Sequence, residues 1–246
     1  MANPQSVELH ALGAEASAGS GPAVDIGSQR TALRLALTVT TVVQAIVKVQ
    51  TSPDGTTGWR DVGTFSASKV AQGVAMCFHG CDRYVRASWS AAITFSLAGD
   101  AQVLYAKKQD VLGVIKADAV AECTEHEWAD ALITATDEAD VFISNANPDP
   151  LTVWRSVVTK HTAEIAAWSL LSGRGIDADD TADMVVKGKY DTAMKWFEWV
   201  SQGKLKPPGM TPPDNLGIRT APADDGASLS GDCVSPGYFT RFGDFG

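Results

Sequence analysis

KYDTAMKWFEWVSQGKLKPPG, residues 189–209, is a helical stretch crowded with large apolar side chains, and the helix is expected to end at a glycine that is followed by lysines and prolines. Five large apolar side chains fall within less than three helical turns: Tyr190, Met194, Trp196, Phe197 and Trp199. Trp196 and Trp199 lie beside the stripe expected to face a core, which consists of Tyr190, Ala193, Phe197 and Val200. The apolar arc is therefore too wide for a helix that buries only one face.

Two interpretations of this arc remain open. In the first, a small three-helix core leaves one tryptophan partly exposed, because a small bundle has little interior. In the second, part of the arc packs against an adjacent subunit, since tryptophan is favoured at the centres of interfaces. Trp196 and Trp199 are therefore candidate interface residues.

Upstream of this stretch, the apolar residues recur at helical intervals from about residue 108. Thr124 and Glu127 have the spacing of a capping box and predict the start of a helix that NPDP, residues 147–150, ends. A second helix is expected over 151–175, with Trp154 on its apolar stripe and its end at Gly173. The acidic segment at residues 176–183 is expected to form the start of the third helix, where the positive end of the helix dipole stabilises carboxylates. We predict a small all-α bundle over residues 107–206.

Before residue 107 the apolar residues alternate instead. TALRLALTVT, residues 31–40, places Leu33, Leu35, Leu37 and Val39 on one face of a strand. AIVKVQTSPDGTTGWRDVGTF, residues 45–65, is typical of two strands joined by a turn at Ser52-Pro53-Asp54-Gly55. Short strands without helices between them predict an antiparallel β-sandwich over residues 1–106, with strands similar to those of jelly-roll modules. The expected fold class is α+β, multidomain.

Residues 207–246 are rich in Pro, Gly, Ser and Asp and show no usable period. Such a segment cannot bury enough apolar surface to fold alone. It carries an aromatic group near its end, formed by Tyr238, Phe239, Phe242 and Phe245. We expect an extended C-terminal arm whose aromatic residues dock onto a neighbouring protein.

The net charge of −9 and the apolar content limit the classes of function that the chain can have. An acidic surface repels phosphate backbones, so free nucleic-acid binding is not expected, although DNA could pass through an acidic ring. No apolar stretch is long enough to predict a membrane helix, and no secretory signal is visible at the N-terminus. The four cysteines form no CxxC pair, which favours synthesis in a reducing cytoplasm.

The sequence contains only weak motifs for catalysis or for metal or cofactor binding. CFHGC, residues 77–81, offers Cys77, His79 and Cys81, which would share a face in a strand, but no second ligand pair follows at zinc-site spacing. IDADDTAD, residues 176–183, lacks the glycine and the closing glutamate of an EF-hand loop. No nucleophile, phosphate-loop or dinucleotide motif is present in the sequence. We therefore expect no enzyme activity, no metal and no cofactor.

Three segments of the C-terminal half carry a family resemblance: ALITATDEADVFISNA (131–146), VVTKHTAEIAAWSLLSGRGIDADD (157–180) and KGKYDTAMKWFEWVSQGKLKPPG (187–209). The matching positions are Arg174, Gly175, Tyr190, Ala193, Trp196, Gly203 and Lys204. Over residues 108–208 the chain resembles the phage head-to-tail connector (adaptor) family, including its Mu-like members. It departs from that family in NANPDPLTVW, residues 145–154, and in the β-domain that precedes the helices.

The resemblance implies a structural virion protein that is made in the host cytoplasm and resides in the head–tail neck. Adaptors form a ring, usually of twelve copies, below the portal protein, and they join the capsid to the stopper or tail-completion protein around the DNA channel. The packaged DNA would pass through without sequence-specific binding. We expect the β-domain to contact the major capsid protein or other neck proteins.

Two other classes of function remain open. The chain could be a virion decoration or carbohydrate- or cell-surface-binding module carried on a helical stalk, for which an exposed aromatic side chain beside polar residues on a β-loop would speak. It could also be a hydrolase that uses the neighbourhood of Cys77 and His79.

Overall fold

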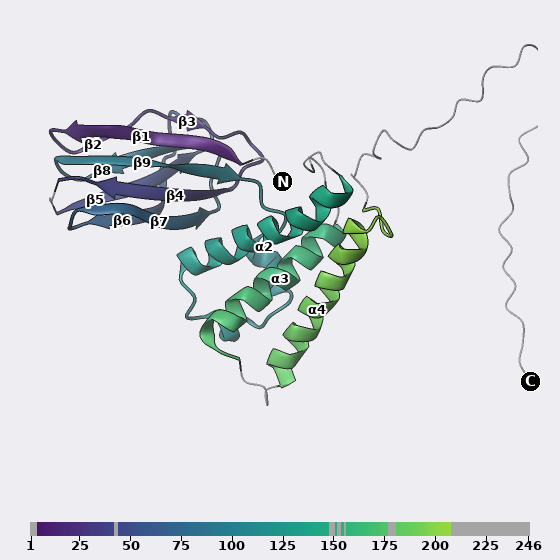
Figure 1. Cartoon of the computed structure of the whole chain (residues 1–246). Coiled ribbons are helices and arrows are strands. Elements are labelled where there is room, and N and C mark those ends of the chain that lie inside the picture. The colour runs from purple at the N-terminus through teal and green to yellow at the C-terminus, as the bar shows by residue number, and fades with distance from the viewer. Residues whose placement is uncertain are drawn as a thin grey trace, which may run out of the picture. The chain divides into compact units, whose positions relative to one another are not determined.

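The N-terminal part of the chain forms two antiparallel sheets (Figure 1). The computed structural model describes residues 4–41, 44–147, 151, 154, 156–176 and 181–207. One sheet has the order β1-β9-β4-β7, and the other has the order β2-β8-β5-β6 with β3 also paired to β8. The strands are β1 (Gln5–Glu15), β2 (Gly19–Ser20), β3 (Val24–Asp25), β4 (Ala32–Val39), β5 (Ala45–Ser52), β6 (Arg60–Ala67), β7 (Ala71–His79), β8 (Tyr84–Trp89) and β9 (Ile93–Gln102).

Side-chain alternation along the strands builds the core between the sheets. On β4, Leu33, Leu35, Leu37 and Val39 are all buried, as the alternating sequence predicts. They share one buried cluster with Val47 and other inward-facing residues of the second sheet. Because successive strand residues point to opposite faces, this pattern fixes the register of each strand.

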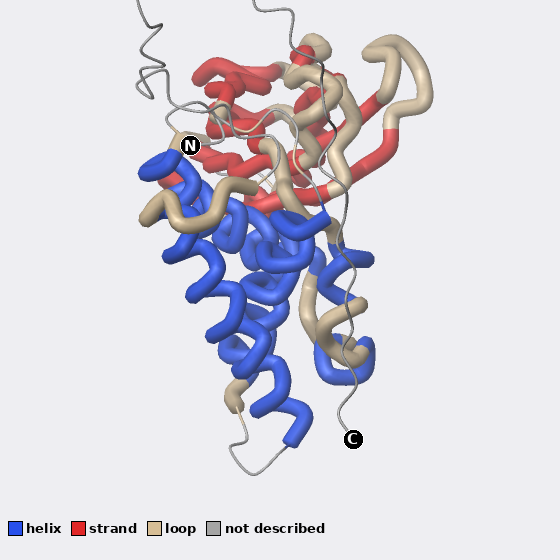
Figure 2. The backbone as a smooth tube through the Cα atoms, turned by 90° about the vertical axis from the view of Figure 1, so that its right-hand side faces the viewer, coloured by secondary structure: helices blue, strands red, loops and turns tan. Residues whose placement is uncertain are grey.

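Three long helices follow the sheets and run side by side (Figures 1 and 2). The helical elements are α1 (Lys108–Leu112), the 3-10 helix η1 (Ala117–Val120), α2 (Glu125–Ala146), α3 (Ser156–Arg174) and α4 (Thr181–Ser201). Thr124 and Glu127 form the predicted capping box at the start of α2, where each side chain bonds the backbone N–H of the other. The predicted α+β organisation, with antiparallel sheets first and helices second, is thus confirmed.

The bounds of α3 differ from the sequence prediction. The helix begins at Ser156, after Trp154, whose indole N–H donates to the Tyr105 carbonyl at 3.2 Å. A buried indole N–H needs such a partner, so Trp154 packs against Tyr105 instead of extending the helix. The helix also passes Gly173 and ends at Arg174, because Gly175 is the residue with positive φ, +96°.

The helical core continues into the sandwich. Ala32 and Cys77 lie in the same buried cluster as the helices. The backbone N–H of Cys77 donates to Nδ1 of His126 at 2.9 Å, and Arg34 lies 3.5 Å from Asp137 of α2. The domain limits expected at residues 106/107 and 206/207 stay predictions. No helix in the described part of the chain is long and apolar enough to cross a membrane.

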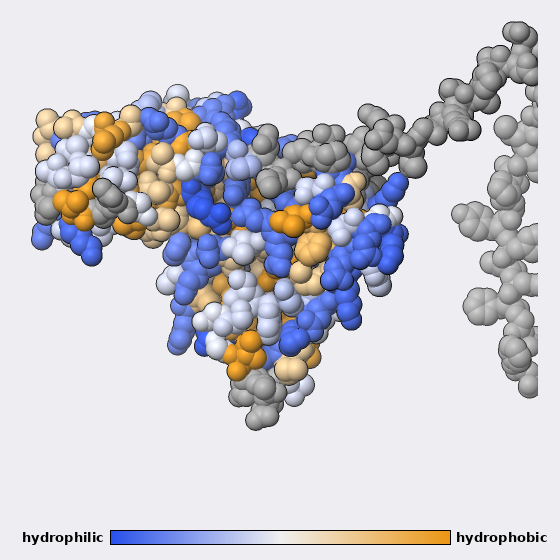
Figure 3. All heavy atoms as spheres, in the orientation of Figure 1, coloured by the Kyte–Doolittle hydropathy of each residue, from blue (hydrophilic) through white to orange (hydrophobic). Residues whose placement is uncertain are grey.

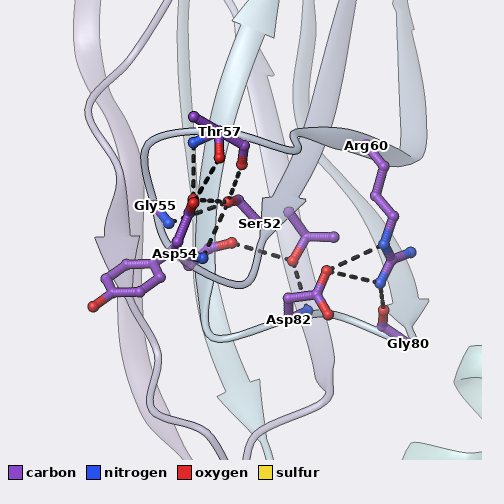
Figure 4. A network of polar contacts seen from close by, with 9 residues as sticks. Ser52, Asp54, Gly55, Thr57, Arg60, Gly80 and Asp82 are labelled. Atoms are coloured by element: carbon purple, nitrogen blue, oxygen red, sulfur yellow. Dashed lines mark hydrogen bonds and ion pairs between the residues drawn. The ribbon is translucent and has the colours of Figure 1, made fainter.

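Asp54 organises the loop between β5 and β6 (Figure 4). Its Oδ1 accepts hydrogen bonds from the backbone N–H groups of Thr56 and Thr57, at 2.9 and 2.8 Å, and its Oδ2 accepts one from the Thr57 hydroxyl at 2.6 Å. These bonds, led by that of the Thr57 side chain, hold the pKa of Asp54 well below its ordinary value. Gly55 follows with a φ of +73°, so the turn expected at residues 52–55 is present.

The exposed Asp54 loop predicts a pH-dependent contribution to stability. Because the folded-state pKa of Asp54 is depressed, its contribution is present above the unfolded-state value of 3.8 and is lost as the pH falls through the folded-state value. We expect Asp54→Asn to lower the urea midpoint at pH 7 and the difference from the parent protein to shrink below about pH 3.8. Glu8→Gln, on the exposed side of β1, is the control. A difference that is constant from pH 7 to pH 2 would contradict this account.

Gly99 of β9 has no room for a side chain against the neighbouring strand β4. A Cβ atom added there would lie 2.0 Å from the carbonyl oxygen of Arg34 on β4. We expect Gly99→Ala to destabilise the protein by about 2 kcal/mol in urea unfolding, since the backbone must shift to make room. Gly13→Ala, whose added Cβ has its nearest neighbours at 3.7 Å, should change stability far less. Equal effects of the two substitutions would show that steric crowding at Gly99 is not the cause.

Candidate interface

One face of α4 forms the predicted apolar stripe. Ala193, Phe197 and Val200 are fully buried, and Tyr190 stacks on Trp168 of α3 with ring centroids 5.7 Å apart. The helix ends in a Schellman motif, in which the N–H of Lys204 donates to the Trp199 carbonyl at 2.9 Å and Gly203 has a φ of +68°. The stripe and this ending fix which side of α4 faces the bundle.

The two tryptophans of α4 have different surroundings. Trp196 is half-buried, with its ring 4.8 Å from the His161 imidazole and 5.0 Å from Phe197. Trp199 is 48% exposed. Trp196 therefore packs within the helical bundle, whereas about half of the Trp199 side chain is exposed to solvent. The other candidate interface residues, Tyr238, Phe239, Phe242 and Phe245, lie outside the described residues.

A groove runs along α3 between α1 and α4. Its volume is about 860 Å³, and a second cavity of about 790 Å³ continues it toward Arg174, sharing Val114 and Val185 with it. Lys160, Ala163 and Glu164 of α3 line the first cavity between its two walls. We call this surface the α3 groove; its walls come from residues 109–119 and from the first half of α4.

Polar contacts tie the groove together. Glu164 is buried, and its Oε2 lies 2.8 Å from Nδ1 of His161. Its Oε1 is 3.9 Å from the ammonium of Lys160, a side chain that is 66% exposed. Lys189 donates to the Val114 carbonyl at 3.0 Å and so links the two walls. The groove therefore has a buried carboxylate and two lysines close to its opening.

Exposed apolar side chains also occur along α4. Val185 is 52% exposed, and Thr192 and Trp199 follow at seven-residue spacing, which places the three on one side of the helix. Val185 and Trp199 are separated by about 21 Å along the helix axis. Ile176 and Met184 are also exposed beside the turn between α3 and α4, where Figure 3 shows apolar surface. Exposed apolar side chains of this kind are candidates for a contact site.

Charge is distributed unevenly over the helices. The acidic residues of α2 are Glu125, Glu127, Asp130, Asp137, Glu138 and Asp140, and α2 contains no Lys or Arg. In contrast, α4 carries Lys187, Lys189 and Lys195 against three acidic residues. Different sides of the bundle thus present different charge.

The CFHGC segment does not bring its three candidate ligands together. Cys77 lies in the helical cluster, with Sγ 3.5 Å from Oδ1 of Asp130, and His79 Nε2 is 2.8 Å from Glu125. Cys81 lies in the sandwich cluster instead, where burial raises its thiol pKa to about 12. The three residues would share a face only in a continuous strand, but β7 ends at His79 and the chain turns at Gly80, which has a φ of +70°. No group that could hold a metal occurs among the described residues.

The IDADDTAD segment and Trp59 both have partners within the chain. In the IDADDTAD segment, residues 177–180 lie outside the described part, and Asp183 lies 3.6 Å from Arg174. Trp59, the aromatic residue after the Asp54 loop, is half-buried, and the Arg86 guanidinium stands 4.0 Å above its ring. One face of Trp59 is thus covered by an arginine from β8.

Trp196 and Trp199 can be recognised in the sequence as candidate interface residues, but the α3 groove cannot. Lys160, Glu164 and Val185 carry no motif, and their relation depends on how α3 and α4 pack. The one sequence feature that pointed to this region was His161 followed by Glu164 three residues later. The same spacing is common for a hydrogen-bonded pair inside a helical core, so it does not indicate a groove.

The helical region follows a β-sandwich, and its described surface carries a groove and several exposed apolar side chains. The model of one protein family, Bacteriophage Mu, Gp36, matches residues 103–216. The match spans α1 to α4 and leaves the sandwich outside it. Comparison with curated proteins found no match. The family match supports a bacteriophage structural protein.

Replacing Trp196 and replacing Trp199 should have different effects on the stability of the fold. Trp196→Ala should lower the free energy of unfolding by about 2 kcal/mol, because it removes the ring packed on His161 and Phe197. Trp199→Ala should change it by less than about 0.5 kcal/mol, because half of that side chain is already in water. Urea unfolding of the two variants tests this directly. Equal losses would show that Trp199 is part of the core.

Proposed function

We propose that this chain is a head-to-tail adaptor of a phage virion, which assembles into a ring below the portal protein. The resemblance implies a ring of twelve copies. In this function the chain joins the capsid to the stopper or tail-completion protein, lines the DNA channel and catalyses no reaction. It resides in the neck of the virion and is made in the host cytoplasm.

The observation that carries the proposal is the match of residues 103–216 to the phage Mu Gp36 family. The exposed surface of the same region adds a physical argument. A closed ring requires a heterologous interface, in which one face of a subunit meets a different face of the next. Val185 is exposed and lines the α3 groove, Trp199 is exposed near the end of α4, and α2 presents a surface of another charge.

The charge of the helical region suits a DNA channel. Because five of the six acidic residues of α2 are at least partly exposed and the helix has no Lys or Arg, its surface would repel the phosphate backbone of DNA. A channel that attracted DNA would slow its passage. The proposal therefore has DNA pass through the ring without sequence-specific binding.

The sandwich would be an added module of the neck. It precedes the region that matches the family model. We propose that it contacts the major capsid protein or a neighbouring neck protein. The covered ring face of Trp59 gives no specific support to the alternative of a carbohydrate-binding module.

Light scattering of the purified chain, with and without the portal protein of the same phage, tests the function. We expect a single-chain mass that becomes a ring mass when portal is added. A chain truncated after Pro208 should lose this response if the C-terminal arm contributes to assembly. A mass that portal leaves unchanged in both forms would contradict the adaptor function and favour a binding module.

A further inference from the structure

A cavity of about 530 Å³ opens between the start of α1 and the turn that follows β7. We call it the junction pocket. Its apolar lining consists of Cys81, Leu104, Leu112 and Leu132, of which all but Leu112 are buried. The volume lies in the range of natural binding pockets, so the cavity has room for side chains of another protein.

We propose that the junction pocket of one copy receives the α2 ridge of a second copy of this chain. The α2 ridge is defined as Thr134, Glu138, Val141 and Asn145, which follow one another at spacings of three or four residues on one side of α2. The inference rests on the proposed ring and names the two surfaces that would meet in it.

The charged residues of the junction pocket are all basic. Lys107 and Lys108 line it, and no described Asp or Glu does, whereas the α3 groove is lined by residues of both signs. Glu125, beside the pocket, is bound by Lys108 at 2.6 Å and by His79 at 2.8 Å. Lys107 is exposed and forms no ion pair with a described residue. Its ammonium group is therefore available to a carboxylate on an incoming surface.

The carboxylate of Glu138 lacks a partner within the described residues. Its side chain is half-buried and forms no hydrogen bond or ion pair with any of them. Burial raises the pKa of Glu138, because the charged form loses contact with water. The adjacent Asp137, in contrast, lies 3.5 Å from Arg34. A cation supplied by a second copy would therefore stabilise the charged form of Glu138.

Val141 is the apolar member of the ridge, and its side chain is 55% exposed. Thr134 and Asn145 on either side are also exposed and carry no charge. Because α2 contains no Lys or Arg, no positive charge on that helix opposes Lys107. Ridges of residues three and four apart are the part of a helix that packs into grooves. Covering Val141 with the leucines of the junction pocket would remove apolar area from water.

The two surfaces lie on opposite sides of α2. Leu132 lines the junction pocket, and Val141 follows it by nine residues, which is about two and a half helical turns. A contact between the pocket and the ridge therefore joins unlike faces of the chain. Such a contact repeats from one copy to the next and can close into a ring. Glu127 and Asp130, at the start of α2, lie outside the ridge and remain free to face a channel.

Charge exchange between the two surfaces tests the inference. One variant carries Lys107→Glu and another carries Glu138→Lys. Under conditions where the parent chain forms rings, with portal if required, each variant should need a protein concentration more than about tenfold higher to assemble, because like charges would meet. The double variant should form rings as the parent does. An equimolar mixture of the two single variants should also assemble, since each altered surface then meets its opposite.

The substitution Glu138→Gln distinguishes an interface role from a role in the fold. It keeps the shape of the side chain and removes the half-buried charge. We expect it to weaken ring assembly, while the midpoint of thermal unfolding of the single chain stays the same or rises. A lower midpoint together with normal ring assembly would overturn the inference.

Matched controls separate this contact from a general effect of charge. Lys69→Glu and Glu8→Lys make the same changes at exposed sites of the sandwich and should leave assembly intact. Circular dichroism melting checks that every variant folds. Normal rings from both Lys107→Glu and Glu138→Lys would overturn the inference and leave the adaptor function standing.

The remaining outcomes also decide. If both single variants fold and lose their rings, and neither the double variant nor the mixture restores them, the pairing of ridge and pocket is overturned. A parent chain that stays single at every concentration, with and without portal, would overturn both the inference and the proposed function.

Discussion

The burial of the middle of α3 is the constraint on which the helical region depends. Residues 161–167, HTAEIAA, have no exposed member, although the run contains a histidine and a glutamate. Burying a carboxylate is costly unless it is hydrogen-bonded, and His161 meets that need for Glu164 at 2.8 Å. The small alanines allow α2, α4 and α1 to approach α3 closely. Trp196 then closes the site over His161, so the aromatic helix and the polar pair stabilise each other.

Much of this could be predicted from the sequence because the signals are local. The alternation at Leu33–Val39, the capping box at Thr124 and the glycine after α4 each depend on a few neighbouring residues. The stripe on α4 follows from a period of 3.6 residues. These features place the strands, the helices and the buried side of the aromatic helix.

The rest depends on contacts between residues far apart in the chain. Trp154 fits a helical stripe, yet its indole is bound by the carbonyl of Tyr105, 49 residues earlier. Cys77 and Cys81 are four residues apart but enter different cores, because Gly80 turns the chain. The α3 groove joins residues near 110, 160 and 190, and no short motif encodes that meeting.

The shared core of sandwich and helices has an evolutionary consequence. Ala32 and Cys77 close one side of the helical cluster, and Tyr105, on the connecting segment, bonds the buried carboxylate of Asp140. A recombination event that replaced everything before the helices would strip this wall and leave Asp140 without its phenol partner. We therefore expect the sandwich loops to tolerate replacement better than β4 and β7, whose residues Ala32 and Cys77 pack against the helices.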